Sequence, residues 1–154
     1  MRSDSEALAD LTSAFASASR PSQFCNPQHC DECAEHEALL QSHDRETLGL
    51  ADVATPAWDP FAMSCPEGLA YYLPTLARFT LETSRQGVAW YGEQLLFHLT
   101  SGGDYNAFVS VCSHSQAAAL AHFLEHLLET KPDLLEPWAD EVFRLIERLR
   151  QIPA

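Results

Sequence analysis

The chain has 154 residues, which is the length of one ordinary domain and is enough to bury a single core. Apolar residues make up 46% and charged residues 20%, values typical of globular proteins, so general disorder and a fibrous class are excluded. The formal net charge is -13, with 22 acidic against 9 basic residues, so we expect no binding to nucleic acid or to anionic membranes. A positively charged protein partner would instead be attracted.

The N-terminal residues and the cysteines indicate a reducing compartment. The first residues, MRSDSEALADL, lack the apolar run of a secretory signal, and no stretch approaches the roughly 18 apolar residues of a membrane span. The five cysteines are an odd number, and three of them cluster, which suits metal binding or free thiols better than a disulfide framework. We therefore expect a cytoplasmic protein.

Helical periodicity predicts that residues 1–154 form one all-α domain of about five or six helices. Ser3 and Glu6 form a capping-box pattern that starts a helix over 3–17, and Pro21 lies in the linker that completes the segment 1–23. A second helix over 31–41 follows, so the segment 24–41 is a junction between a connector and a helix. Residues 42–63 read as one long irregular connection, anchored to the core by Leu48, Leu50, Val53, Trp58 and Phe61.

The segment 64–154 is predicted to be the helical core. Ser64 and Pro66 supply an N-cap and a proline in the first turn, and Pro74 lies inside the helix that they start, where it should cause a kink. The predicted helices of this segment cover residues 65–83, 86–100, 113–129 and 136–151.

Twelve residues from Cys25 to His36 contain three of the five cysteines and two of the seven histidines. The spacing of Cys30 and Cys33 lets two thiolates share one metal ion. Cys25 and His36 would complete a tetrahedral zinc site, with His29 as an alternative ligand. On a continuous helix His29, Cys33 and His36 would share one face, whereas a thiolate knuckle at Cys30 and Cys33 needs a turn. The two ligand sets therefore cannot be equally good. The missing second half-site weakens the case for a metal. A zinc ion here would be structural rather than catalytic, because a Cys-rich shell is normally closed. Packing of the thiols as small buried residues and a redox pair are the alternatives.

A second metal motif lies in the helix over 113–129. His122, Glu125 and His126 match the H-x-x-E-H string of inverted zinc peptidases, in which two histidines bind zinc and the glutamate activates water. The residues that follow form only one turn and one helix, which is too little for a substrate cleft. The same residues, with Glu129, form the polar stripe of an amphipathic surface helix, and we prefer that interpretation.

The order of several strings resembles an uncharacterised bacterial family known as a domain of unknown function. The strings are HCDECAEHEALL, CPEGLAYYLPTLARFTLE and SQAAALAHFLEHLL, and the resemblance covers about residues 24–128. The unusual element is Pro-Glu-x-x-x-Tyr-Tyr-Leu-Pro, because it places a proline inside a helix directly after two tyrosines. The resemblance implies a small bacterial protein and no particular activity.

Together these observations favour a non-enzymatic protein-binding module of the immunity or regulatory type, since no assembled catalytic set is found. The expected partner is a basic protein. The alternative is a metalloprotein with a structural zinc site in the segment 25–36, and a more distant alternative is an H-x-x-E-H zinc hydrolase.

Overall fold

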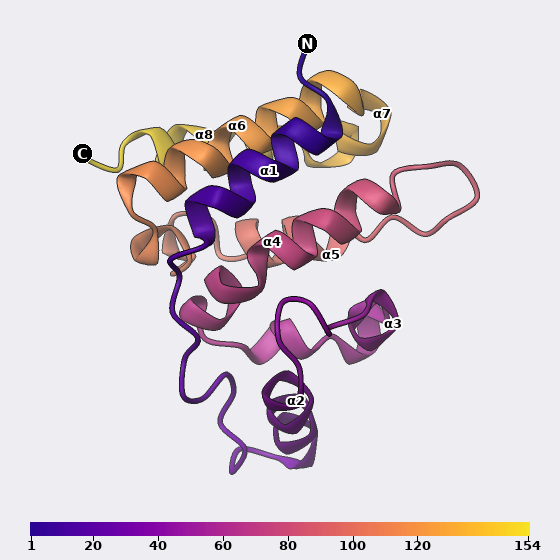
Figure 1. Cartoon of the computed structure of the whole chain (residues 1–154), viewed down its shortest axis with the longest axis vertical. Helices are drawn as coiled ribbons and strands as arrows, with labels where there is room; N and C mark the ends of the chain where they lie inside the picture. The colour runs from indigo at the N-terminus through magenta and orange to yellow at the C-terminus, as the bar shows by residue number, and fades with distance from the viewer.

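The computed structural model describes residues 1–154 and contains helices and no strand, so the all-α prediction is confirmed (Figure 1). Eight α-helices are present, more than the predicted five or six. Six of them correspond to the predicted helices: α1 (Asp4–Phe15), α2 (Asp31–Ser42), α4 (Pro66–Glu82), α5 (Gly92–Thr100), α6 (His114–Thr130) and α8 (Ala139–Arg150). The two additional helices, α3 (Leu50–Val53) and α7 (Pro132–Leu135), are single turns too short for periodicity to reveal.

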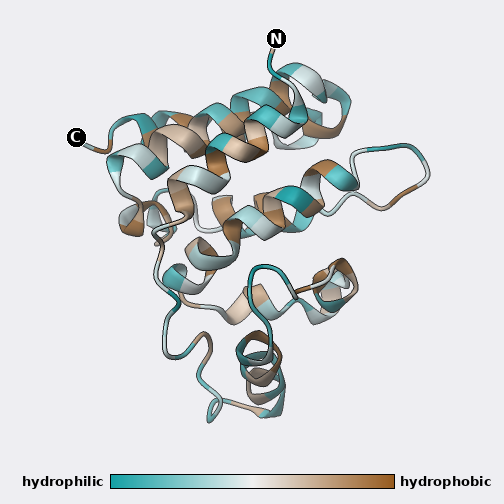
Figure 2. Ribbon diagram, viewed as in Figure 1, coloured by the Kyte–Doolittle hydropathy of each residue, from teal (hydrophilic) through white to brown (hydrophobic).

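Five helices build the main bundle, and α2 lies apart from it. α1 packs between α6 and α4, α8 covers α6, and α5 lies against both α4 and α8. α2 stands at the lower end in Figure 1 and contacts the bundle mainly through a 3-10 helix, η2 (Pro60–Met63). Hydrophobic and hydrophilic residues alternate along the helices (Figure 2), and the buried apolar side chains join into one core. No helix is both long and apolar enough to cross a lipid bilayer.

Side-chain caps fix the starts of two of the bundle helices. Ser3 Oγ accepts from Glu6 N–H at 3.1 Å while Glu6 Oε2 accepts from Ser3 N–H at 2.8 Å, as predicted. Ser113 and Gln116 form the same reciprocal pair at the start of α6. At α4 the N-cap is Cys65 rather than the predicted Ser64, and Pro66 occupies the first helical position.

The segment before α5 is a turn, although the periodicity predicted a helix beginning at residue 86. Gly87 adopts a φ of 79°, a left-handed conformation that a helix does not contain. Trp90 Nε1 then donates to Thr80 O at 3.0 Å, and Tyr91 N–H donates to Thr83 Oγ1 at 3.0 Å. These bonds hold the turn against the end of α4, so α5 begins only at Gly92.

The predicted irregular connection, residues 42–63, contains α3, η2 and one further 3-10 helix, η1 (Pro56–Trp58). Leu48, Val53 and Phe61 are buried, as expected of its anchors. Trp58 is 41% exposed and therefore packs less deeply than predicted.

Tyr72 of α4 and Arg20 of the linker after α1 hold the end of α2 in place. Tyr72 Oη lies 2.8 Å from Leu40 O and 2.7 Å from His43 O, so the two carbonyls share its one O–H donor. Arg20 donates to Leu40 O, Gln41 O and His43 O, and its guanidinium lies over the Phe24 ring. α2 lacks a basic residue in its last turn, so these contacts supply the donors that its terminal carbonyls require.

Candidate functional site

The first turn of α2 positions Cys30 and Cys33. Cys30 is the N-cap, in extended conformation with φ of -167°, and its Sγ accepts a hydrogen bond from Cys33 N–H at 3.4 Å. A cysteine can cap a helix in this way because its sulfur replaces the oxygen of a serine or aspartate cap. The predicted loop-to-helix junction is therefore present, and it brings both thiols of the C-x-x-C to one side of the helix start.

His29 completes a group of three metal-binding side chains. Its Nδ1 lies 3.4 Å from Cys33 Sγ, and the ligand atoms of His29, Cys30 and Cys33 all lie within 4.8 Å of one another. The preceding loop places the imidazole, since His29 N–H donates to Asn26 O at 3.2 Å. Cys33 is buried, whereas His29 and Cys30 are exposed. The group is thus open to solvent on one side.

The two thiols of this group differ in acidity. Hydrogen bonds from the Cys33 backbone N–H and from the His29 and Cys33 side chains lower the pKa of Cys30. The hydrogen bond with Cys30 and burial raise the pKa of Cys33. The start of a helix also favours negative charge, so Cys30 is the thiol that becomes a thiolate first.

Two of the predicted ligands lie outside this group. Cys25 is buried, its Sγ donates to Pro60 O at 3.8 Å, and burial raises its pKa to about 12. His36 is also buried, with its ring 4.7 Å from the Trp58 ring and its Nε2 at 3.2 Å from Glu32 Oε1. The structure therefore joins Cys30 and Cys33 with the alternative ligand His29, and it separates them from Cys25 and His36.

The three residues of the H-x-x-E-H string in α6 have different surroundings. His126 is buried rather than exposed on a polar stripe, and its Nε2 lies 2.7 Å from Asp4 Oδ1 at the start of α1. Glu125 forms an ion pair with Arg150 of α8, and His122 is exposed. Nε2 of His126 faces a carboxylate, and the ligand atoms of these three residues do not come together as those of His29, Cys30 and Cys33 do.

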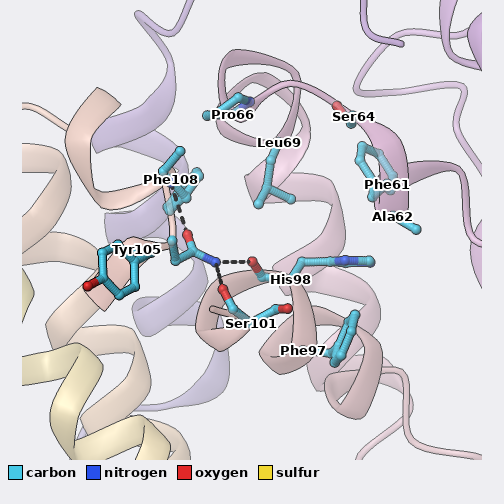
Figure 3. Close-up of a pocket in the computed structure, with 12 residues that line it drawn as sticks. Phe61, Ala62, Ser64, Pro66, Leu69, Phe97, His98, Ser101, Tyr105 and Phe108 are labelled. Atoms are coloured by element: carbon cyan, nitrogen blue, oxygen red, sulfur yellow. Dashed lines mark hydrogen bonds between the residues drawn. The ribbon is translucent and has the colours of Figure 1, made fainter. Parts of the chain in front are cut away.

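A pocket of about 340 Å³ lies between the start of α4, the end of α5 and the loop that follows α5 (Figure 3). Seven of its twelve lining residues are apolar, and two serines, one asparagine and one histidine add polar groups. The lining residues are Phe61, Ala62, Ser64, Pro66, Leu69, Phe97, His98, Ser101, Tyr105, Asn106, Ala107 and Phe108. Asn106 is fully engaged within the chain, because its Nδ2 donates to His98 O and Ser101 O and its Oδ1 accepts from Phe108 N–H.

A buried carboxylate holds the histidine of this pocket. His98 Nε2 lies 2.7 Å from Asp59 Oδ2, and both side chains are almost fully buried. Gln94 Nε2 donates to the same oxygen at 2.8 Å, and Phe61 N–H donates to Asp59 Oδ1 at 2.9 Å. Asp59 is the one acidic residue of the chain that is buried.

The sequence interpretation did not identify Asp59, Gln94 and His98 as a unit. Gln94 and His98 are four residues apart on a predicted helix, so their side chains lie on the same face. Two polar residues on one helix face were the only sign in the sequence that these residues act together. Asp59 lies 39 residues from His98, in a segment without periodicity, and no local pattern links the two residues.

The sequence matches no family model, no curated protein and no solved structure. The resemblance to an uncharacterised bacterial family therefore stays a prediction.

Proposed function

We propose that this protein binds a divalent transition metal, preferably Zn²⁺, through His29, Cys30 and Cys33. The observation that carries the proposal is the convergence of the three ligand atoms within 4.8 Å. Two thiolates and one imidazole form a donor set that binds zinc in preference to calcium or magnesium, because calcium and magnesium take oxygen ligands.

The arrangement favours a metal with one position open to the surroundings. Zinc takes four ligands in a tetrahedron, and the chain supplies three. His29 and Cys30 are exposed, so the fourth position faces solvent and takes water or a donor group of another molecule. The burial of Cys33 fixes the inner side of the site, and the start of α2 favours the thiolate charge that the metal requires.

Elemental analysis of protein purified without added metal tests this proposal. We expect about one zinc per chain, and we expect Co²⁺ substitution to give a thiolate-to-cobalt charge-transfer band. Cys30→Ser should abolish the band. Cys65→Ser is the matched control, because Cys65 lies outside the group and should leave both the metal content and the band unchanged. A metal-free protein that also fails to take up Co²⁺ under reducing conditions contradicts the proposal.

A second function, binding of a positively charged protein, is supported by the placement of the acidic residues. All but one of the 22 acidic side chains lie outside the buried core, so the net charge of -13 acts at the surface. A surface potential of one sign accelerates the approach of an oppositely charged partner and makes that approach dependent on salt. This function is non-enzymatic, of the immunity or regulatory type.

Affinity purification from the native host at low and at high salt tests the second function. We expect a basic protein that is retained at low salt and lost at high salt. Retention of acidic or neutral proteins alone, with no dependence on salt, contradicts it. The metal-free Cys30→Ser variant, run in parallel, shows whether the partner supplies the fourth ligand to the metal.

A further inference from the structure

One ring nitrogen of His98 has no hydrogen-bond partner within the chain. Its side chain is 6% exposed, and its Nε2 is bound to Asp59, whereas Nδ1 has no hydrogen-bond partner within the chain. Figure 3 shows the ring between the Phe61–Ala62 segment and Phe97. The centroid distances to the Phe61 and Phe97 rings are 6.3 and 6.0 Å, and both phenylalanines line the pocket. His98 lines the pocket, and its Nδ1 is not among the fully buried polar atoms that lack a partner, so this nitrogen is accessible to water or to a ligand group.

The hydrogen bonds of Asp59 determine what Nδ1 can accept. A carboxylate accepts and does not donate, so the proton of the neutral imidazole lies on Nε2 and points to Asp59. Nδ1 then carries a lone pair and acts as an acceptor. A ligand group that binds here must therefore donate a hydrogen bond, as an ammonium or hydroxyl group does.

The charges around the pocket favour a cationic donor. No lysine or arginine lines the pocket, and the Asp59 carboxylate lies directly behind the imidazole. The aromatic rings of Phe97 and Tyr105 are 53% and 95% exposed and stand at the rim, where their faces attract a positive charge. The net charge of -13 adds a long-range attraction of the same sign.

We propose that this pocket binds a small organic amine, in which a protonated amino group donates to His98 Nδ1 and an apolar or aromatic body contacts Phe61, Leu69 and Phe97. The volume of about 340 Å³ lies at the lower end of the range of roughly 300–1,000 Å³ for small-molecule sites. The site does not involve His29, Cys30 or Cys33, so it is independent of the metal site proposed above.

Isothermal titration with three molecules of similar shape tests the proposal. Phenethylamine, phenethyl alcohol and phenylacetate share an aromatic body and differ in a cationic, a neutral and an anionic end group. We expect saturable binding of phenethylamine, weaker binding of the alcohol and none of the acid. Amide shifts in a ¹H–¹⁵N spectrum should change at residues 97–106 on addition of the amine. No saturable binding of phenethylamine, or equal binding of phenylacetate, overturns the proposal.

Two variants and one control locate the binding. His98→Phe keeps a ring and removes the hydrogen-bond acceptor, while Gln94 and Phe61 still donate to Asp59. We expect this variant to bind phenethylamine at least about tenfold more weakly, because it loses a hydrogen bond to a charged group. If that variant does not fold, Phe97→Ala at the exposed rim should weaken binding severalfold. Phe143→Ala, at an equally exposed phenylalanine of α8 outside the pocket, should bind as the unchanged protein does. Unchanged affinity in every variant that folds contradicts the proposal.

Discussion

Cys30 differs from the other four cysteines in exposure and in charge environment. It is the one exposed cysteine, and it caps α2, whereas Cys25, Cys33 and Cys112 are buried. The hydrogen bonds that lower its pKa come from Cys33 and His29, so they persist only while the first turn of α2 is intact. Its reactivity therefore reports on the local fold as well as on the site.

We predict that Cys30 of the metal-free protein is alkylated first by iodoacetamide near neutral pH. The thiolate is the reacting form, and its fraction is larger for the thiol with the lower pKa, so Cys30 should react faster than Cys65. Burial raises the pKa of Cys65, which makes this partly exposed thiol the suitable internal reference. Peptide mass spectrometry at several times gives both rates. Equal rates, or faster labelling of Cys65, would show that the N-cap does not activate Cys30.

At the scale of elements, Arg45 connects α1, the loop after α2 and α4. Its guanidinium donates to Phe15 O at 2.8 Å, Ala16 O at 3.3 Å and Ala18 O at 3.2 Å, at the end of a helix with no basic residue in its last turn. Its Nε donates to Tyr71 O, a carbonyl in the turn of α4 that precedes Pro74. A proline inside a helix disturbs the hydrogen bonds of the preceding turn, and Arg45 supplies a donor there.

We expect Arg45→Ala to lower the free energy of unfolding by about 2–3 kcal/mol, since partly buried carbonyls of two helices lose a charged donor. Urea denaturation followed by circular dichroism measures the change. Arg78→Ala is the control: Arg78 pairs with Glu82 at an exposed site and lies over the Phe79 ring, so its loss should cost about 1 kcal/mol or less. Similar effects of the two substitutions would mean that the Arg45 hydrogen bonds contribute little.

The contact of α1 with α6 depends on pH through Asp4. Burial alone would raise the pKa of Asp4, but hydrogen bonds from His126 and Lys131 outweigh it and lower the pKa. A carboxyl with a lowered folded-state pKa contributes stability that is present above its unfolded pKa of 3.8 and is lost as the pH falls through the folded value. The side chain is 44% exposed, so the contribution should be below about 1 kcal/mol.

We therefore expect Asp4→Asn to be less stable than the unchanged protein at pH 6, and we expect this difference to shrink as the pH falls below 3.8. The measurement is urea unfolding over this pH range. Asp133→Asn, at an exposed position of α7, should follow the unchanged protein throughout. If Asp4→Asn is as much less stable at the lowest pH as at pH 6, the loss of stability comes from packing and not from the carboxylate charge.

The sequence predicted the elements better than the contacts between them. Caps such as Ser3 with Glu6, and apolar periodicity, act within a few residues, so the six long helices and the Cys30 junction could be predicted. Asp4 and His126 lie 122 residues apart, and Asp59 and His98 lie 39 apart, so their pairing depends on tertiary packing that no local pattern encodes. The packing of His36 against Trp58 is likewise a contact that helical spacing does not encode.

At the scale of the whole molecule, the acidic surface opposes the folded state. Folding brings like charges together, and the ion pairs Arg78–Glu82, Arg150–Glu125 and Lys131–Asp4 compensate only some of the 22 acidic residues. Net repulsion should thus exceed the attraction within these three pairs, which lie at or near the surface and are individually weak. The balance decides the sign of the salt effect on stability.

We predict that sodium chloride stabilises the protein at neutral pH. Raising the ionic strength from about 10 to about 150 mM shortens the screening length from about 30 to about 8 Å, which weakens repulsion across the surface more than attraction within contact pairs. We expect Tm to rise by about 2–4 °C, corresponding to about 1 kcal/mol for a chain of this size. Near the isoelectric point of about 4.7 the net charge vanishes, so the same addition of salt should leave Tm nearly unchanged. A fall in Tm at neutral pH would show that the ion pairs, and not the excess of acidic residues, dominate the surface electrostatics.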